Sequence, residues 1–481
     1  MIGVLLAAVL AFLGLAAPAQ ASELISIATP SRNVDTARAV FNGPPPKELR
    51  ANVLLPDGYT PTRRWPLLVL LHGIGDTYET WARPDRGDIV ATAKGLPAIV
   101  VMPEGGRGFY TNWFNGGKRG DPGWERFYLD ELIPTIEARF PILPGRPNHA
   151  IAGLSMGGFG ASYLGSQRPD YFGAVAAFSG FVQHQRAEVA AGLRTLGGAE
   201  YEDIFGPMRG QYATGHNPTR IVANLRRSRL FVAAGDGIAE PGVSSEPAAV
   251  AAGGAVEAGL RQQNEEFTAA ARAAEIDLTY RPQTGVHDWP YWRRHLRQAI
   301  EWGLFRPVVE DPVGWTYSTT ATTGRMWGLA YAFTAPPETT VTFTREGGQV
   351  RGELAPGGAG ATVRVQDVVT GCGFVATVPF DRALPAHVCG RIALQVSPRR
   401  LLAGRRTTLR VRAIEVADDG TRSALEGARV AFGRRSARTG ENGRAALRVR
   451  ARWPAGLRRV RASHTGLPPA RVRVRVAAAR R

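Results

Sequence analysis

The segment Ile151–Gly160 contains the pattern Gly153-Leu-Ser155-Met-Gly157, which constrains the fold more than any other part of the sequence. This pattern is typical of a sharp turn from a β-strand into an α-helix that carries an exposed serine. The turn is strained and its flanking backbones pack closely, so the two glycine positions leave no room for a Cβ. A chain with 57 glycines can produce the pattern by chance. The interpretation therefore depends on a strand before Ser155 and a helix after it.

Between residues 49 and 304, apolar runs that are typical of buried strands alternate with segments of helical spacing. We expect strands at 49–55, 65–71, 98–102, 149–152, 173–178, 230–234 and 276–281, and helices at 124–140, 156–167, 257–274 and 292–304. Pro134 predicts a kink in the first of these helices. The alternation predicts an α/β fold with a mostly parallel sheet, with its chemistry at the carboxyl ends of the strands.

The remaining segments predict export and two further β regions. Residues 2–17 are apolar and precede Ala19-Gln20-Ala21, which predicts a signal peptide over 1–21, with an uncleaved membrane anchor as the alternative. The α/β domain is expected over 22–309, where residues 22–45 form a lead-in. An all-β region is expected over 310–396, and an Arg-rich β domain similar to an immunoglobulin-like sandwich over 397–481. In an exported protein, Cys372 and Cys389 predict one disulfide, with two free thiols as the alternative.

The charge is concentrated at the C-terminal end of the chain. Residues 396–481 contain 23 arginines, no lysine and five acidic residues, whereas residues 1–395 are neutral overall. Such asymmetry favours contact with an anionic polymer of the cell envelope or with lipid head groups. The segment Arg471–Val476 places three arginines on one face of a strand. The alternative is a solvated face in a protein from a GC-rich genome, and nucleic acid is not expected as a partner of an exported protein.

A nucleophilic serine needs a histidine that takes its proton and a carboxylate that orients the histidine. His287 lies in a loop just after the predicted strand 276–281, which makes it the candidate base. Asp236 directly follows the strand 230–234, and Glu257 stands at the start of the predicted helix 257–274. Spacing along the chain does not choose between these two acids.

The same chemistry needs two N–H groups that stabilise an oxyanion. Met156 supplies one candidate as the first residue of the predicted helix, and Ile74 supplies the other after the strand that ends in Leu71-His72-Gly73. We expect His72 to form a wall of the substrate pocket. No cluster of metal ligands is present in the sequence, and the reaction requires no cofactor.

Several ordered motifs resemble one family of proteins. The motifs are Val100-Val-Met-Pro103, Phe109-Tyr-Thr-Asn-Trp113, Trp124-Glu125, Gly153-Leu-Ser-Met156 and Gly285-Val-His-Asp-Trp-Pro-Tyr-Trp292. Together they look like the esterase D superfamily of α/β-hydrolases, and most like its antigen-85 mycolyltransferase branch. The resemblance implies an α/β-hydrolase fold over about residues 48–305.

The same resemblance implies roles for individual residues. It favours Glu257 over Asp236 as the acid, and it implies that Trp113 and Trp289 bind substrate, with Trp289 lining an acyl-acceptor site. Gly75 stands where the branch has an arginine, the loop after Gly73 is shorter, and the branch's cysteine pair near Trp113 is missing. These departures speak against trehalose as the acceptor.

The residues and the resemblance together predict a secreted or envelope-associated serine esterase or acyltransferase. Its substrates would be an ester or acyl lipid and, for transfer, a sugar hydroxyl as acceptor. A plain carboxylesterase that hydrolyses feruloyl or acetyl esters is the first alternative. A non-catalytic protein that binds the cell envelope is the alternative from another class.

Overall fold

The computed structural model describes residues 21–115, 123–194, 199–243, 247–384, 390–416, 422–451, 453–464 and 467–478. The chain divides after Val309 into two units, at the position where the sequence also places a domain boundary. Nearly all of the predicted signal peptide, and Cys389, lie outside the described residues, so export and the disulfide stay predictions. Cys372 is fully buried. No helix among the described residues is long and apolar enough to cross a membrane.

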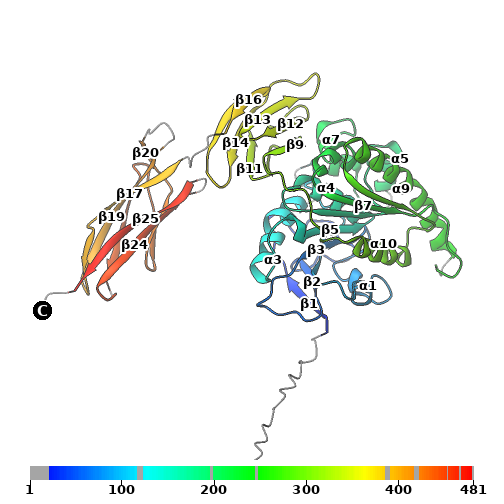
Figure 1. Cartoon of the computed structure of the whole chain (residues 1–481), viewed down its shortest axis with the longest axis horizontal. Helices are drawn as coiled ribbons and strands as arrows, with labels where there is room; N and C mark the ends of the chain where they lie inside the picture. Colours follow the sequence, from blue (N-terminus) through cyan, green and yellow to red (C-terminus); the bar gives the residue numbers. More distant parts are fainter. Residues whose placement is uncertain are drawn as a thin grey trace, which may run out of the picture. The chain divides into compact units, whose positions relative to one another are not determined.

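The first unit is built on one eight-stranded sheet with the order β1-β2-β4-β3-β5-β6-β7-β8 (Figure 1). Its strands are β1 (Glu23–Ala28), β2 (Arg50–Leu55), β3 (Leu67–Leu71), β4 (Ile99–Pro103), β5 (His149–Leu154), β6 (Ala174–Phe178), β7 (Arg229–Ala234) and β8 (Asp277–Pro282). β3 to β8 are parallel to one another, whereas β2 is antiparallel to both β1 and β4. The mostly parallel sheet of an α/β-hydrolase fold is therefore confirmed. The lead-in expected over 22–45 instead begins with the edge strand β1.

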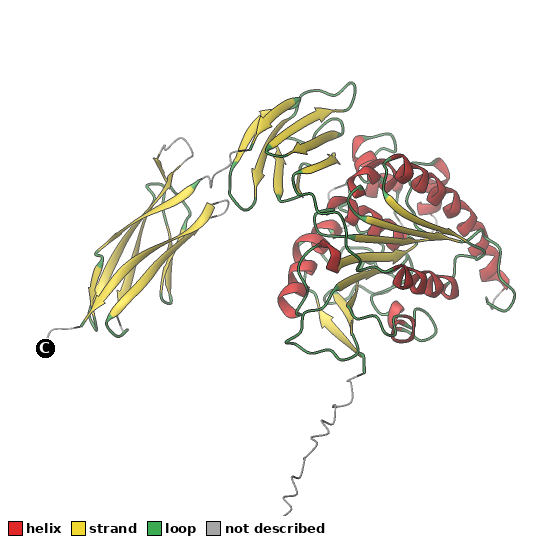
Figure 2. Ribbon diagram, viewed as in Figure 1, coloured by secondary structure: helices red, strands yellow, loops and turns green. Residues whose placement is uncertain are grey.

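Helices cover both faces of this sheet (Figure 2). They are α1 (Ile89–Thr92), α2 (Trp124–Arg126), α3 (Ile133–Arg139), α4 (Met156–Gln167), α5 (Ala187–Gly192), α6 (Tyr201–Phe205), α7 (Gln211–Gly215), α8 (Pro218–Ile221), α9 (Pro247–Ala273) and α10 (Trp289–Trp302), with short turns η1 (Thr80–Ala82), η2 (Phe127–Leu132), η3 (Arg146–Asn148) and η5 (Val222–Leu225). Alternate residues of a buried strand point to opposite faces. Val69 accordingly belongs to the core cluster that also holds residues of α3, α4 and α9, and Leu68 belongs to the cluster that holds residues of α1 and α10.

Two helices differ from the expectation. The predicted helix 124–140 contains the π-helical turn η2, in which the N–H of Ile133 donates to the carbonyl of Tyr128, directly before Pro134. Proline has no N–H and its ring clashes with the carbonyl four residues earlier, and the wider turn accommodates it. The long helix α9 begins at Pro247, ten residues before the predicted start. Glu257 therefore lies inside this helix, and the prediction that it opens the helix is wrong.

The second unit consists of antiparallel sheets, with one parallel pair between β18 and β25. Its first part has two four-stranded sheets, β10-β11-β14-β15 and β16-β13-β12-β9. The strands are β9 (Gly314–Thr319), β10 (Thr323–Met326), β11 (Leu329–Phe333), β12 (Val341–Glu346), β13 (Gln349–Leu354), β14 (Thr362–Asp367), β15 (Gly373–Thr377) and β16 (Phe380–Ala383). The two sheets share one core that includes Tyr331, Phe343 and Val363.

The second part of this unit is a sandwich of two further sheets. The first sheet is β17-β19-β20 with β23 beside β19, and the second is β18-β25-β24-β21-β22. The strands are β17 (Arg391–Ser397), β18 (Arg400–Leu402), β19 (Arg406–Val416), β20 (Arg422–Ala424), β21 (Arg429–Phe432), β22 (Arg435–Arg438), β23 (Arg444–Arg450), β24 (Gly456–His464) and β25 (Leu467–Ala477). Because β17 pairs along its whole length with β19, residues 391–396 belong to this sandwich, and the predicted boundary at 396/397 is about six residues too late.

Candidate active site

Ser155 stands at the sharp turn between β5 and α4, at the carboxyl edge of the sheet. Its φ of 52° lies in the left-handed region, which costs about 1–3 kcal/mol for a residue with a side chain. A Cβ on Gly153 would lie 2.3 Å from the carbonyl oxygen of Gly157, and one on Gly157 would lie 2.5 Å from the carbonyl oxygen of Leu71. The two glycines thus have the packing reason that the sequence pattern predicts, and the strand and helix around Ser155 are present.

Three side chains from separate elements form a chain of hydrogen bonds at this turn. The Oγ of Ser155 lies 2.9 Å from Nε2 of His287 and donates to it. The Nδ1 of the same ring lies 2.7 Å from Oε2 of Glu257 and donates to the carboxylate. Both distances lie within the range required for proton transfer and for orientation of the imidazole. Trp292 packs edge-on against the His287 ring, with the ring centroids 4.8 Å apart.

The carboxylate of Glu257 is fully buried and is held on its other side as well. Its Oε1 accepts hydrogen bonds from Oγ of Ser179 at 2.7 Å and from the N–H of Gly235 at 2.6 Å. Burial raises the pKa of this carboxyl, but the hydrogen bonds from His287, Ser179 and Gly235 and the charge of His287 together lower it by more, so the pKa lies below its ordinary value. The structure therefore brings an ionised Glu257 to the histidine.

Asp236, the other candidate acid, bonds the backbone of its own loop and the loop that leads to His287, and not the imidazole. Its Oδ1 accepts the N–H of Ile238 at 2.9 Å and of Gly285 at 3.2 Å, and its Oδ2 accepts the hydroxyl of Thr284 at 3.2 Å. These bonds shape the backbone just before His287. The structure thus gives Asp236 a supporting position and does not place it on the imidazole.

The loop after β3 carries Ile74, the second candidate oxyanion donor. A Cβ on Gly73 would lie 2.6 Å from Cδ1 of Leu154 and 3.5 Å from Cβ of Ser155, so this loop passes directly beside the serine. Met156 is the first residue of α4, and the N–H of a first helical residue has no acceptor within the helix. Both candidate donors therefore lie on backbone next to Ser155.

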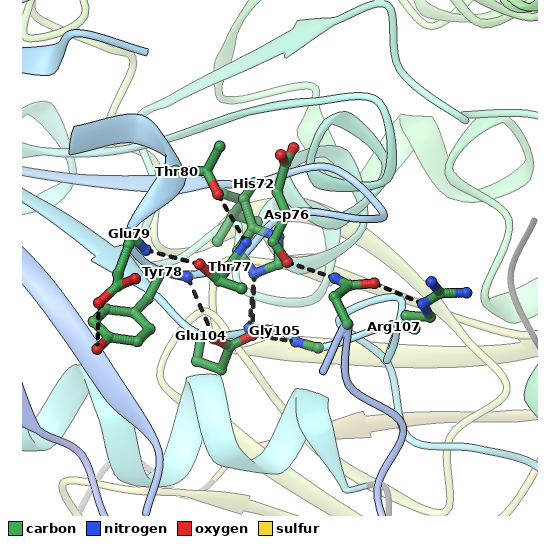
Figure 3. A network of polar contacts seen from close by, with 12 residues as sticks. His72, Asp76, Thr77, Tyr78, Glu79, Thr80, Glu104, Gly105 and Arg107 are labelled. Carbon is green, nitrogen blue, oxygen red and sulfur yellow. Dashed lines mark hydrogen bonds and ion pairs between the residues drawn. The ribbon is translucent and has the colours of Figure 1, made fainter. Parts of the chain in front are cut away.

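His72 is not a pocket wall, because it is 1% exposed. Its Nδ1 donates to the carbonyl of Gly73 at 2.8 Å, and its Nε2 accepts the N–H of Gly105 at 3.0 Å (Figure 3). Burial lowers the pKa of this ring, but Glu104, Asp76 and the carbonyl of Gly73 together raise it by more, so the net shift is upward. Both ring nitrogens are occupied inside the protein, which makes His72 a support behind the oxyanion loop rather than a substrate contact.

Glu104 and Asp76 extend this support and are residues that the sequence analysis missed (Figure 3). Oε1 of Glu104 accepts the N–H groups of Gly105 and Gly106 at 3.0 and 2.7 Å. Oδ2 of Asp76 accepts the N–H of Gly73 at 3.3 Å. Burial raises the pKa of Asp76 to about 6. The available signal was an acidic residue soon after each of two segments already singled out: Asp76 stands three residues after the His72-Gly73 step, and Glu104 directly follows the motif Val100–Pro103.

Trp113 and Trp289, which the resemblance assigns to substrate binding, are nearly buried. Trp113 is 6% exposed, and its indole N–H donates to the carbonyl of Gly108 at 3.1 Å. Trp289 is 3% exposed and packs edge-on against Trp81, with ring centroids 5.0 Å apart. Both rings belong to core clusters, and their role as substrate contacts stays a prediction. Among the described residues, no three carboxylate, histidine or cysteine side chains are grouped so that they could hold a metal ion.

Comparison with known proteins gives a consistent picture. The family model named Esterase matches residues 44–302, which is more than half of the chain. Esterase Rv1288 of Mycobacterium tuberculosis (strain H37Rv) is 34% identical over 196 residues, covering 38% of this chain and 42% of that protein. An acetyl esterase of Caldicellulosiruptor saccharolyticus is 26% identical and covers 49% of this chain and 82% of its own.

Two further mycobacterial proteins are similar to the chain, and the name of the first gives a transferase activity. The diacylglycerol acyltransferase/mycolyltransferase Ag85A of Mycobacterium tuberculosis is 27% identical, over 46% of this chain and 65% of its own. Among solved structures, the Mycobacterium tuberculosis protein MPT51 matches 60% of this chain and 98% of its own, with a TM-score of 0.45 and 22% identity. Esterase Rv1288, in contrast, is matched by this chain over less than half of its own length.

Proposed function

The chain belongs to the Esterase family, in an esterase D-like superfamily with antigen-85 relatives, and from that premise we propose that it is an exported serine esterase. The observation that carries the proposal is the continuous hydrogen-bonded chain from Ser155 through His287 to Glu257. A carboxylate, an imidazole and a hydroxyl in this order convert a weak nucleophile into an effective one.

In the proposed reaction, Oγ of Ser155 attacks the carbonyl carbon of an ester while Nε2 of His287 takes its proton. The negative charge that develops on the carbonyl oxygen is stabilised by the N–H groups of Ile74 and Met156. The imidazolium then gives its proton to the leaving alcohol, which leaves an acyl group on the serine. Glu257 keeps the imidazole in the required tautomer and stabilises its charge.

The acyl group leaves Ser155 when water or another hydroxyl attacks it, with His287 now acting as the base. Attack by water makes the protein an esterase. The name of its acetyl esterase relative suggests acetyl esters, and that of a similar endo-1,4-beta-xylanase/feruloyl esterase of Xylanibacter ruminicola suggests feruloyl esters. Attack by a sugar hydroxyl makes it an acyltransferase, and the similarity to Ag85A supports this second candidate. Gly75 stands where the antigen-85 branch has an arginine, and this difference speaks against trehalose as that sugar.

A single set of assays tests both candidates. The purified protein is incubated with p-nitrophenyl acetate, with methyl ferulate and with a long-chain acyl ester plus sugar acceptors, beside Ser155→Ala. We expect hydrolysis of at least one ester by the native protein and none by the variant. A rise in turnover with acceptor concentration, together with an acylated sugar product, would favour transfer. Activity that persists in Ser155→Ala would overturn the proposed mechanism.

For the C-terminal sandwich we propose retention of the exported enzyme on anionic polymers of the cell envelope. The outer face of its five-stranded sheet carries exposed arginines on all five strands. They are Arg400, Arg429, Arg438, Arg459, Arg461, Arg471, Arg473 and Arg475. Four pairs stand directly opposite each other, 400/475, 459/473, 461/471 and 429/438. Like charges opposite each other destabilise a sheet, and these strands contain no Asp or Glu.

The arginines of this sheet are separated from the acidic residues, because the five acidic residues of 396–481 all lie outside these strands. This separation supports a binding surface over a sequence that is simply rich in arginine. Retention of the secreted protein on isolated cell walls is expected at low salt and to fall steeply as salt is raised, since exposed charges are screened over about 8 Å at physiological ionic strength. The double substitution Arg459→Ser and Arg473→Ser should weaken retention. Retention that is independent of salt and of this substitution would rule the surface out.

A further inference from the structure

A second arginine-bearing feature lies at one end of the same sandwich. A cavity of about 1040 Å³ opens between the β19–β23 pair and the turn that joins β21 to β22. Its lining includes five arginines and one tryptophan, Arg406, Arg434, Arg435, Arg448, Arg450 and Trp453. This volume is at the upper end of the range for ligand pockets, which is about 300–1,000 Å³.

The walls of the cavity are cationic and contain no carboxylate. Arg406 and Arg450 stand directly opposite each other on β19 and β23, an arrangement that costs free energy when nothing lies between the charges. Arg450 is partly fixed, because its Nε donates to the carbonyl of Gly404 at 3.0 Å. Within the described part of the chain, none of the five lining arginines forms an ion pair with Asp or Glu. An anion would relieve this repulsion.

One side of the cavity is aromatic and is shaped by the β21–β22 turn. Trp453 packs edge-on against Phe432, with ring centroids 5.0 Å apart. Gly433 in the turn has a φ of 58°, and a Cβ there would lie 2.5 Å from Cζ2 of Trp453. Only glycine therefore allows the indole to close over the turn. Trp453 is half-buried, so part of the ring remains accessible from the cavity.

We propose that this cavity is a binding site for an anionic saccharide, whose carboxylate or phosphate groups pair with Arg406, Arg450 and their neighbours. Guanidinium groups bind carboxylates and phosphates through two parallel hydrogen bonds. The flat apolar surface of Trp453 suits one face of a sugar ring, and the hydroxyls of Thr407 and Thr408 can bond its hydroxyl groups. The inference deepens the proposed retention, because it adds recognition of a sugar to attraction by charge.

The test uses the full-length protein and four polymers that separate sugar from charge. Polygalacturonate carries carboxylates on sugars, phosphomannan carries phosphates on sugars, polyglutamate carries carboxylates without sugars, and dextran is a neutral polysaccharide. Binding is measured by titration calorimetry at one fixed salt concentration. We expect the native protein to bind at least one of the two anionic polysaccharides roughly tenfold more tightly than polyglutamate, and not to bind dextran.

Variants then assign the binding to the cavity. Trp453→Ala and, separately, Arg406→Ala with Arg450→Ala should each weaken binding of the preferred polysaccharide roughly tenfold. The matched control, Arg429→Ala with Arg438→Ala, removes the same charge from an opposed pair on the other sheet and should weaken binding of all polyanions by the same small factor. Thermal unfolding of each variant shows whether it folds, and the exposed pair Arg434→Ala with Arg435→Ala replaces any variant that does not.

The two anionic polysaccharides distinguish a carboxylated ligand from a phosphorylated one. Equal affinity for polyglutamate and for both polysaccharides, with cavity variants that behave like the control, would overturn the cavity as a saccharide site. Salt-dependent retention through the arginine face would survive that result. Loss of polyanion binding only in the control variant would also reject the cavity.

Discussion

Replacing Glu257 by glutamine keeps the shape of the side chain and removes its charge. In the native protein, Oε1 of Glu257 accepts two hydrogen bonds, from Ser179 and from the N–H of Gly235. That position must therefore remain an oxygen in the variant, which turns the amide nitrogen toward Nδ1 of His287. Nδ1 lies 2.7 Å from the atom that becomes this nitrogen.

The consequence is the wrong tautomer of the histidine. An amide nitrogen only donates, so Nδ1 must accept, and the ring proton moves to Nε2. Nε2 can then no longer take the proton of Ser155, to which it is hydrogen-bonded at 2.9 Å. In triads of this kind the same substitution lowers kcat by ~10⁴, or about 5 kcal/mol of transition-state stabilisation.

The assay is kcat for the best p-nitrophenyl ester, with thermal unfolding as a check on folding. Asp236→Asn is the matched control. We expect it to keep more than about a tenth of the activity, because Asp236 does not bond the imidazole and the amide oxygen of asparagine can still accept the N–H groups of Ile238 and Gly285. The reasoning would be refuted by a folded Glu257→Gln variant whose kcat falls less than about tenfold. It would equally fail if Asp236→Asn lost about a thousandfold, since Asp236 would then be the acid.

Three further substitutions test separate parts of the site. Asp76 lies beside the oxyanion loop and ionises with a pKa of about 6. Above that pH its negative charge opposes the charge that develops on the substrate, so kcat/KM of Asp76→Asn, divided by kcat/KM of the native enzyme, should rise between pH 5 and pH 8. A ratio that stays constant would show that this charge does not reach the reacting atoms. Glu125 has a pKa raised by burial to about 7 from 4.5, so the folded state binds the proton more tightly and native stability should fall as pH rises from 4.5 to 7. In urea unfolding, the free energy of unfolding of Glu125→Gln should fall by about 2 kcal/mol less than that of the native protein over this pH range, a figure discounted because the side chain partly reaches solvent. Equal pH dependence of the two proteins would contradict the assignment. Gly153→Ala should lower the free energy of unfolding by about 3 kcal/mol or more, because its Cβ would lie 2.3 Å from a backbone atom. The control Gly259→Ala, whose Cβ meets open space on α9, should raise the free energy of unfolding by up to about 1 kcal/mol. Equal effects of the two substitutions in denaturant titrations would count against the packing argument.

Much of the first unit could be predicted because its strands are buried on both faces. A strand such as β3, Leu67–Leu71, is apolar at every position and fully buried, and a short apolar run of this kind indicates a central parallel strand when helical segments alternate with it. The position of Ser155 followed for the same reason, since the strand before it and the helix after it were both visible. The π-turn before Pro134 could not be predicted, because a proline indicates that the helix is disturbed but does not indicate the geometry of the disturbance.

Spacing along the chain left the choice between Glu257 and Asp236 open; the resemblance favoured Glu257, and the physical reason lies in the tertiary structure. Asp236 has the expected place after β7, but the adjoining loop turns back so that the Gly285 N–H binds its carboxylate. Glu257 reaches His287 because α9 begins early enough to pass the histidine loop, where Gly253 accepts the N–H of His287 at 3.2 Å. The contacts join residues far apart in the sequence, and no local pattern records them.

The same limit explains why His72, Trp113 and Trp289 were placed in the substrate pocket. Each follows a motif at the carboxyl edge of the sheet, where substrates bind, but position along the chain does not say which way a side chain points. All three turn inward and are at most 6% exposed. The expectation for His72 was therefore wrong, whereas the substrate-binding role that the resemblance implies for the nearly buried Trp113 and Trp289 stays a prediction.

The buried polar groups of the first unit gather where catalysis requires fixed geometry. One group, His72 and Glu104, holds the backbone beside Ile74 through the carbonyl of Gly73 and the N–H groups of Gly105 and Gly106. The other, Ser179 with Gly235, holds Glu257. A buried polar group is stable only when it is hydrogen-bonded, so each network has few alternative arrangements. Donors and a carboxylate that are already oriented need no reorganisation when charge develops on the substrate, which is the largest contribution expected from a site of this kind.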